Sequence, residues 1–179
     1  MSPFVPASPA AAEAALEACE PPPPRPALER CGADDVVLDL GAGDGTVAIT
    51  AARAFGARAV GLELDAALVA RATERAADAG VEKRVAFECT DIFAPGDKAA
   101  ELCSDWERRG ATIVTLFLLP AALKRLEAPL ALWLSREDLA DGRRRRVVSF
   151  GWPIDNIGAP VAECAGAETA AAWRVYATA

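Results

Sequence analysis

The chain has 179 residues, of which 53% are hydrophobic, so it can form one domain with a core of ordinary size. Its net charge of −7 argues against a nucleic-acid partner, because such partners require a broad basic surface. Histidine is absent, which excludes a Ser-His-Asp triad, a Cys-His pair and a histidine-ligated metal. Five cysteines without CxxC spacing fit a reducing compartment, and no metal site is predicted.

The N-terminal part of the chain predicts a helix over residues 9–19 and a proline-rich bend over 21–26. Too little chain precedes the bend to form a second domain, so we expect one domain over 1–179, with 1–26 as helix and connector. No run of 18 apolar residues occurs, and the first twenty residues hold no lysine or arginine. We therefore expect no membrane segment and a cytoplasmic location, or a mitochondrial one if a targeting segment was removed.

The next segment joins a strand to a glycine turn and a helix. Residues 36–40 form a short apolar run typical of a buried parallel strand. Three glycines follow at alternate positions: Gly41, Gly43 and Gly45. They allow a sharp turn and a close ligand approach, and residues 46–55 predict a helix beyond them. The spacing differs from the GxGxxG of dinucleotide sites, and Asp39 and Asp44 add negative charge, which favours a ligand with a cationic group.

Acidic residues lie at or just past the ends of three successive predicted strands. Glu63 lies in the second strand, over 58–65, about 20 residues past the turn, where nucleotide sites place a ribose-binding carboxylate. The third strand, over 85–89, is followed by Asp91. Since ligands bind at the carboxyl edge of an open α/β sheet, we expect these side chains to share one site with Asp39.

The rest of the chain continues the alternation of helices and strands. Helices are predicted over 66–79, 97–109 and 120–134, with an interruption at Pro129 left open, and strands over 111–118 and 146–151. Residues 161–164 and 172–177 can pair as a terminal antiparallel hairpin. This alternation predicts a parallel sheet with right-handed crossovers.

The arginine run and one cysteine can be explained by structural roles alone. The arginines at 143–146 fit a solvent-exposed cap of a loop, or alternatively a docking site for an acidic partner or lipid phosphate. Cys89, on a strand predicted to be buried, fits the role of a small core residue.

These motifs resemble the class I, or seven-β-strand, S-adenosylmethionine-dependent methyltransferases. The resemblance implies S-adenosylmethionine as cofactor and an α/β, Rossmann-like, seven-stranded, mostly parallel sheet with helices on both faces and an antiparallel C-terminal hairpin. Glu63 resembles the acceptor for the ribose hydroxyls, and Asp91 and Ile92 the pair that holds adenine. The implied cofactor-binding residues are Asp39, Gly41, Ala42, Gly43, Asp44, Gly45, Glu63, Leu64, Asp91, Ile92 and Phe117.

A narrower resemblance rests on the segments Pro3-Phe4-Val5-Pro6-Ala7-Ser8, Gly61-Leu62-Glu63 and Phe117-Leu118-Leu119-Pro120. Together with the glycine turn they are similar to a small lysine methyltransferase family, over nearly the whole chain. Its known members modify the ATP synthase c-subunit and the adenine nucleotide translocase, and it has bacterial relatives. The resemblance implies a protein-lysine N-methyltransferase with a protein substrate.

Catalysis would need a neutral amine, because lysine has a pKa of about 10.4. We expect an apolar pocket beside the sulfonium that lowers this pKa, with Phe4, Pro6, Leu119 and Pro120 as the catalytic residues. Simpler roles stay open: Leu118 and Leu119 as core, Phe4 as packing for the first helix, Asp44 as a turn residue. Trp152 fits either the substrate mouth or the core.

Other functions stay open as well. The same cofactor can serve a small-molecule substrate, or the chain can be a non-catalytic cofactor-binding module. A nicotinamide oxidoreductase is disfavoured by the glycine spacing. The segment 117–120 lacks the Asn/Asp-Pro-Pro-aromatic motif common in enzymes that methylate bases or glutamine amides, which disfavours those substrates. The oligomeric state is not predicted.

Overall fold

The computed structural model describes residues 7–17, 31–94, 98–136, 139, 142, 144–164 and 172–177. Within them, the helices are α1 (Pro9–Glu17), α2 (Thr46–Phe55), α3 (Ala66–Asp78), α4 (Ala99–Arg108) and α5 (Pro120–Leu134). The strands are β1 (Val36–Leu40), β2 (Arg58–Glu63), β3 (Val85–Cys89), β4 (Ile113–Leu116), β5 (Arg146–Phe150), β6 (Ala162–Cys164) and β7 (Trp173–Ala177).

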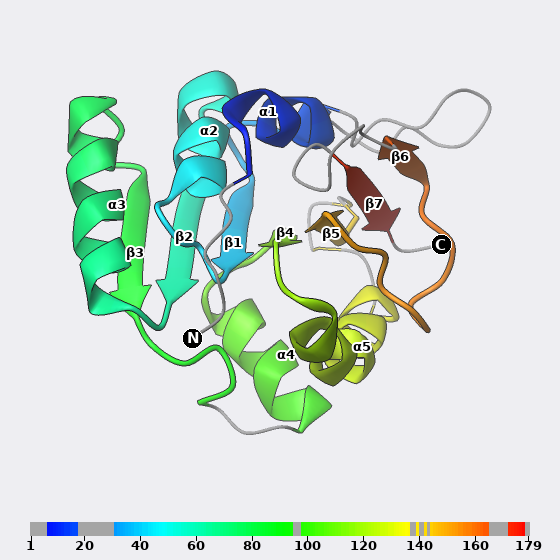
Figure 1. The fold of residues 1–179 in the computed structure, drawn as a ribbon. Coiled ribbons are helices and arrows are strands. Elements are labelled where there is room, and N and C mark those ends of the chain that lie inside the picture. Colours follow the sequence, from blue (N-terminus) through cyan, green and yellow to red (C-terminus); the bar gives the residue numbers. More distant parts are fainter. Residues whose placement is uncertain are drawn as a thin grey trace.

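All seven strands form one sheet with the order β3-β2-β1-β4-β5-β7-β6 (Figure 1). The first five strands in the chain run parallel, and β7 runs antiparallel to both β5 and β6. This confirms the expected Rossmann-like sheet and its antiparallel end. The order also places β7, the last strand in the sequence, between two strands that precede it.

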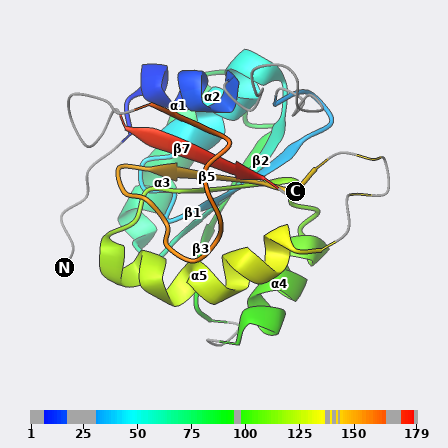
Figure 2. The same ribbon diagram turned by 90° about the vertical axis from the view of Figure 1, so that its right-hand side faces the viewer.

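Helices cover both faces of the sheet. The views in Figures 1 and 2 show α1, α2 and α3 on one side and α4 and α5 on the other. Each layer closes its own apolar core. Between α4 and α5, the rings of Trp106 and Trp133 meet edge to face with their centroids 6.1 Å apart. The order of the strands and these two layers leave the carboxyl ends of β1, β2 and β3 at a common edge.

Several predicted boundaries shift at the ends of elements, and α5 continues through Pro129 without interruption. The thiol of Cys103 donates to the carbonyl oxygen of Pro129 at 3.1 Å, which attaches α4 to α5 at that position. No helix among the described residues has both the length and the apolar character needed to cross a bilayer.

The prediction that Cys89 is a core residue is wrong, because its side chain is exposed. β3 is an edge strand, and burial falls along it, so only its first residue is fully buried. A short apolar run does not by itself distinguish a central strand from an edge strand.

The predicted solvent-exposed cap at 143–146 is also wrong for the two arginines nearest the strand. Arg146 is 1% exposed and forms an ion pair with Asp35, which also accepts a hydrogen bond from the Thr112 hydroxyl at 2.6 Å. Arg145 is buried against the ring of Trp133, 5.3 Å from its centroid. Arg143 lies outside the described residues.

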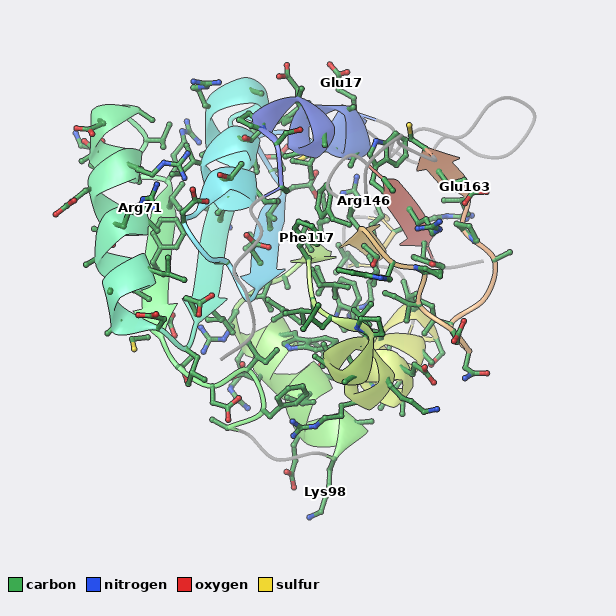
Figure 3. The ribbon with its side chains drawn as sticks, viewed as in Figure 1. Glu17, Arg71, Lys98, Phe117, Arg146 and Glu163 are labelled. Atoms are coloured by element: carbon green, nitrogen blue, oxygen red, sulfur yellow. The ribbon has the colours of Figure 1, made fainter. Side chains whose placement is uncertain are left out.

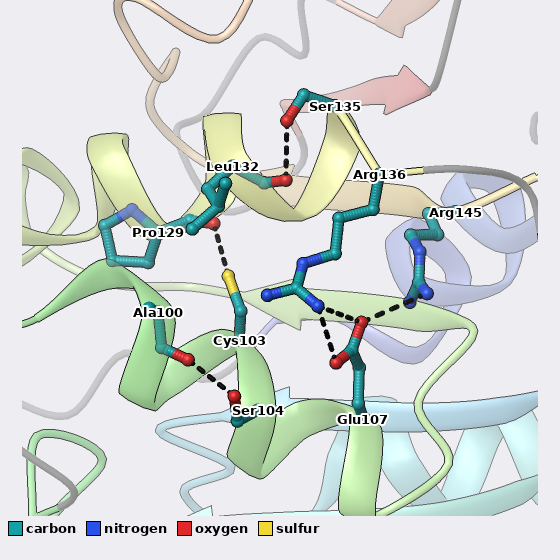
Figure 4. Close-up of polar contacts among 9 residues, drawn as sticks. All are labelled: Ala100, Cys103, Ser104, Glu107, Pro129, Leu132, Ser135, Arg136 and Arg145. Carbon is teal, nitrogen blue, oxygen red and sulfur yellow. Dashed lines mark hydrogen bonds and ion pairs between the residues drawn. The ribbon is translucent and has the colours of Figure 1, made fainter.

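Arg145 belongs to a second ion-pair group that joins helix ends to the start of β5. The carboxylate of Glu107 accepts from Arg136 at 2.8 Å and from Arg145 at 3.2 Å (Figure 4). The two groups therefore fix the amino ends of β4 and β5, opposite the edge where the predicted ligand site lies. A partner-docking role does not fit the buried side chains of Arg145 and Arg146.

Candidate active site

The glycine turn after β1 is held by backbone hydrogen bonds to β2. The N–H groups of Gly41 and Ala42 both donate to the carbonyl oxygen of Leu62, at 2.8 and 3.0 Å. All three turn glycines have positive φ, namely Gly41 at 77°, Gly43 at 56° and Gly45 at 79°. A side chain at any of them would strain the backbone, and α2 begins directly after the turn.

Close packing beneath the turn is a second reason why two of these positions require glycine. A Cβ atom on Gly41 would lie 2.7 Å from Leu118, and one on Gly45 would lie 2.5 Å from the ring of Phe87. Gly61 in β2 meets the same ring at 2.5 Å, although its φ is ordinary. The role of Gly61 was missed from the sequence, because its signal lies in Phe87, 26 positions along the chain and on another strand.

Glu63 joins the turn to the end of β2. One oxygen of its carboxylate accepts from the Gly43 N–H at 2.9 Å, and the other accepts from the N–H groups of Leu64 and Asp65 at 2.8 and 3.0 Å. A carboxylate offers about four acceptor positions, so acceptor capacity remains for a ligand hydroxyl. The structure thus brings two of the predicted cofactor-binding residues, Glu63 and Gly43, into direct contact.

The segment after β3 lies beside the end of β2. The Thr90 N–H donates to the carbonyl oxygen of Glu63 at 2.8 Å. Asp91 then closes a short turn, in which its Oδ1 accepts from the Phe93 N–H at 2.9 Å and its carbonyl accepts from the Ala94 N–H. Ile92 packs against the core beneath α4 and α5.

Leu64, directly after the β2 carboxylate, is 71% exposed. A single exposed apolar side chain is common on protein surfaces and does not by itself indicate a ligand site. Leu64 lies between the carboxylates of Glu63 and Asp65 in the sequence, and the Cys89 thiol donates to its carbonyl oxygen at 3.6 Å. The end of β2 therefore places an exposed apolar side chain directly after the Glu63 carboxylate.

Asp44 is held inside the protein fold by neighbouring side chains. Its Oδ1 accepts from the Thr46 hydroxyl at 2.8 Å, and its carboxylate forms an ion pair with Arg75 on α3. The Arg75 guanidinium also donates to the Asp44 carbonyl at 2.7 Å. These contacts favour the turn role that the sequence left open for Asp44. The contribution of Arg75 was missed, since nothing in the local pattern links it to a residue 31 positions earlier.

Asp39 is the buried acid of the site. It is 3% exposed, and its Oδ1 accepts from the Thr115 hydroxyl at 2.8 Å. Burial raises the pKa of Asp39 to about 7, and the nearby carboxylates of Glu63 and Asp44 add to the rise. The hydrogen bond from Thr115 acts in the opposite direction but does not outweigh the loss of solvent.

Replacing Asp39 with asparagine should make the unliganded protein more stable at pH 8 than the parent, by roughly 1 to 3 kcal/mol. The native carboxyl group holds its proton more tightly than the unfolded one. The parent therefore loses stability as the pH rises from about 4 to about 7, while the variant, which keeps an oxygen for Thr115, does not. Urea unfolding at pH 4.5, 6 and 8 measures this, and equal pH slopes for the two proteins would contradict it.

The segment 117–120 follows β4 at the same edge. The ring of Phe117 lies 6.4 Å from that of Phe150 and 6.0 Å from that of Trp152. Figure 3 shows Phe117 near the middle of the view and Lys98 extending from the lower edge of the molecule. Phe117 and Trp152 are both partly buried, and their rings form an aromatic pair between the ends of β4 and β5.

The next three residues have different positions. Leu118 packs into the core beneath α4 and α5, which favours the core role that was left open for it. Leu119 is 42% exposed, and Pro120 is the first residue of α5, where its missing N–H leaves no helical hydrogen bond unmade. Phe4 and Pro6, expected on the other side of the pocket, lie outside the described residues.

Comparison with known proteins finds methyltransferases by family, by sequence and by structure. The family model described as the ANTKMT methyltransferase domain matches residues 39–160. A protein-lysine N-methyltransferase of Saccharolobus islandicus is 30% identical over 128 residues, which cover 71% of this chain and 68% of that protein. An RNA methyltransferase from Salinibacter ruber, solved with S-adenosyl-L-homocysteine, superposes with a TM-score of 0.70 and 31% identity over 97% of this chain and 92% of that one.

A more distant structure shares the fold alone. The S-adenosylmethionine-dependent methyltransferase from Thiobacillus denitrificans has a TM-score of 0.52 and 22% identity, over 81% of this chain and 49% of that chain. The strand order, the glycine turn and the acidic strand ends define a class I, S-adenosylmethionine-dependent methyltransferase. Within that class, the chain belongs to the family of the ANTKMT methyltransferase domain.

Proposed function

We propose that this methyltransferase transfers a methyl group to a lysine side chain of a protein. The observation that carries the proposal is the 30% identity with a relative named for protein-lysine N-methylation. The family match over residues 39–160 supports it. The absence of histidine also fits, since methylation of an amine requires mainly alignment and a neutral nitrogen, without a histidine base.

The ends of β2 and β3 would hold the adenosyl part of the cofactor. Glu63 has about one acceptor position left for a ribose hydroxyl after its three backbone contacts. Leu64 and Ile92 would offer apolar surface to the adenine ring, and the Asp91 carboxylate would accept from the adenine amino group. S-adenosylmethionine, when bound, supplies a methyl group on a positively charged sulfur.

The end of β4 would receive the lysine. The exposed Leu119 and Pro120 at the start of α5 would form one wall of the lysine pocket, and the partly buried rings of Phe117 and Trp152 would form another. An apolar wall disfavours the charged ammonium, so it lowers the pKa of an inserted lysine from about 10.4. Aromatic faces would also attract the cationic side chain as it approaches.

RNA is the second candidate substrate, because the Salinibacter ruber RNA methyltransferase is 31% identical over nearly the whole of both chains. Two features of this chain argue against it. The net charge of −7 gives no overall attraction to phosphates, and the segment 117–120 reads Phe-Leu-Leu-Pro where base-methylating enzymes commonly carry Asn/Asp-Pro-Pro-aromatic.

The substrate class can be tested with a methyl-labelled cofactor and a cell lysate. The lysate is separated after reaction into protein, RNA and small molecules, and labelled protein is hydrolysed to identify methyl-lysine. We expect the label in lysine, and a parallel reaction with the Glu63→Ala variant should show much less. Label in RNA alone would support the second candidate, and label in the small-molecule fraction would contradict both.

The Glu63→Ala variant should bind S-adenosylhomocysteine about 5- to 150-fold more weakly than the parent, which corresponds to about 1 to 3 kcal/mol. The ribose would lose its carboxylate acceptor, and the turn loses the hydrogen bond from the Gly43 N–H, while its backbone bonds to Leu62 remain. Calorimetric titration measures the dissociation constant. Glu88→Ala is the matched control, because Glu88 is an exposed acid on β3 whose carboxylate pairs with Arg109. Unchanged binding by Glu63→Ala would exclude the ribose role.

A further inference from the structure

A stacked pair joins the segment after β3 to α5. The guanidinium carbon of Arg125 lies 3.5 Å from the centroid of the Phe93 ring. Phe93 is partly buried against the core beneath α4 and α5, so Arg125 covers the side of the ring that is turned to α5. A cation held over an aromatic face is attracted by the electrons of the ring.

Phe93 is in turn hydrogen-bonded to Asp91. The Phe93 N–H donates to the Asp91 Oδ1 at 2.9 Å, and the Ala94 N–H donates to the Asp91 carbonyl at 2.8 Å. The direction of the Asp91 carboxylate therefore depends on where the backbone of Phe93 lies. The cation–ring stack adds a fixed point for that backbone, and it is supplied by α5.

We propose that Arg125 is a positioning residue for adenine: by holding Phe93 against α5, it fixes the Asp91 carboxylate in the orientation that accepts from the adenine amino group. The inference rests on the role proposed above for Asp91. It also makes the adenine site depend on α5, the helix whose first residue, Pro120, lies at the proposed lysine pocket.

The test compares S-adenosylhomocysteine with S-inosylhomocysteine, which lacks the amino group. The parent should prefer the adenine compound by about tenfold or more, the effect of one hydrogen bond to a charged acceptor. In Arg125→Ala this preference should fall about two- to fivefold, the range expected for an exposed cation–ring contact. Arg125→Lys should keep part of it, since lysine can also stack on the ring.

The control is Lys124→Ala, an exposed neighbour on the same helix, which should keep the full preference. A merely structural role for Arg125 would weaken binding of both compounds equally and leave their ratio unchanged, and that outcome overturns the inference while the role of Asp91 stands. A parent without any preference would contradict the role of Asp91 and the inference together. Thermal unfolding of each variant checks that the chain is folded.

Discussion

Replacing Gly43 with valine should weaken binding of S-adenosylhomocysteine at least about 100-fold, which corresponds to about 3 kcal/mol. The φ angle of Gly43 is 56°, a region that a β-branched residue rarely adopts, so the turn would shift. That shift would break the 2.9 Å contact between the Gly43 N–H and Glu63, and the new methyl groups would occupy the place where the ligand approaches the backbone.

The matched control is Gly80→Val, which separates backbone strain from loss of the site. Gly80 has a similar φ of 69°, but open space surrounds its Cβ position, and it lies past the end of α3. Both variants should lose stability through strain, and only Gly43→Val should lose cofactor binding. Calorimetric titration distinguishes them, and retained affinity in Gly43→Val would show that the turn faces away from the ligand.

Replacing Arg146 with methionine should lower the free energy of unfolding by about 3 to 5 kcal/mol. The carboxylate of Asp35 is buried, and it would lose its ion pair with Arg146 at the start of β1, β4 and β5. The hydrogen bonds from the Thr112 hydroxyl and the Gly32 N–H remain, and neither donor carries a full positive charge. Urea unfolding at constant pH measures the difference.

A double variant, Asp35→Asn with Arg146→Met, should recover much of that loss, because it leaves no uncompensated buried charge. Arg71→Met, at an exposed position on α3, is the control and should change stability by less than about 0.5 kcal/mol. If Arg146→Met were as stable as Arg71→Met, the ion pair at the base of the sheet would contribute nothing to folding.

The parts of the fold that follow from local pattern were predictable from the sequence. The bounds of β1, α2 and β3 agree with the prediction to the residue, because apolar runs and glycines mark them locally. The contact of Glu63 with the glycine turn could be expected in the same way, since the carboxyl ends of parallel strands meet at one edge.

Features that depend on distant residues were not predictable in this way. The position of β3 at the sheet edge decides the exposure of Cys89, and the burial of Arg146 depends on Asp35, 111 positions earlier. The contact between Arg75 and Asp44 joins two elements whose separation the sequence does not reveal. Each of these contacts depends on the order of strands or on helix packing, and a single sequence gives no direct signal of either.

The order of the strands has a consequence for how the protein acquires its structure during synthesis. β6 joins the sheet through β7, and β7 is the last of the seven strands to leave the ribosome. Until then, β5 exposes an unpaired row of backbone groups on its outer side, and such rows attract other extended chains. The parallel part of the sheet therefore depends on the strand made last to cover its open side at β5.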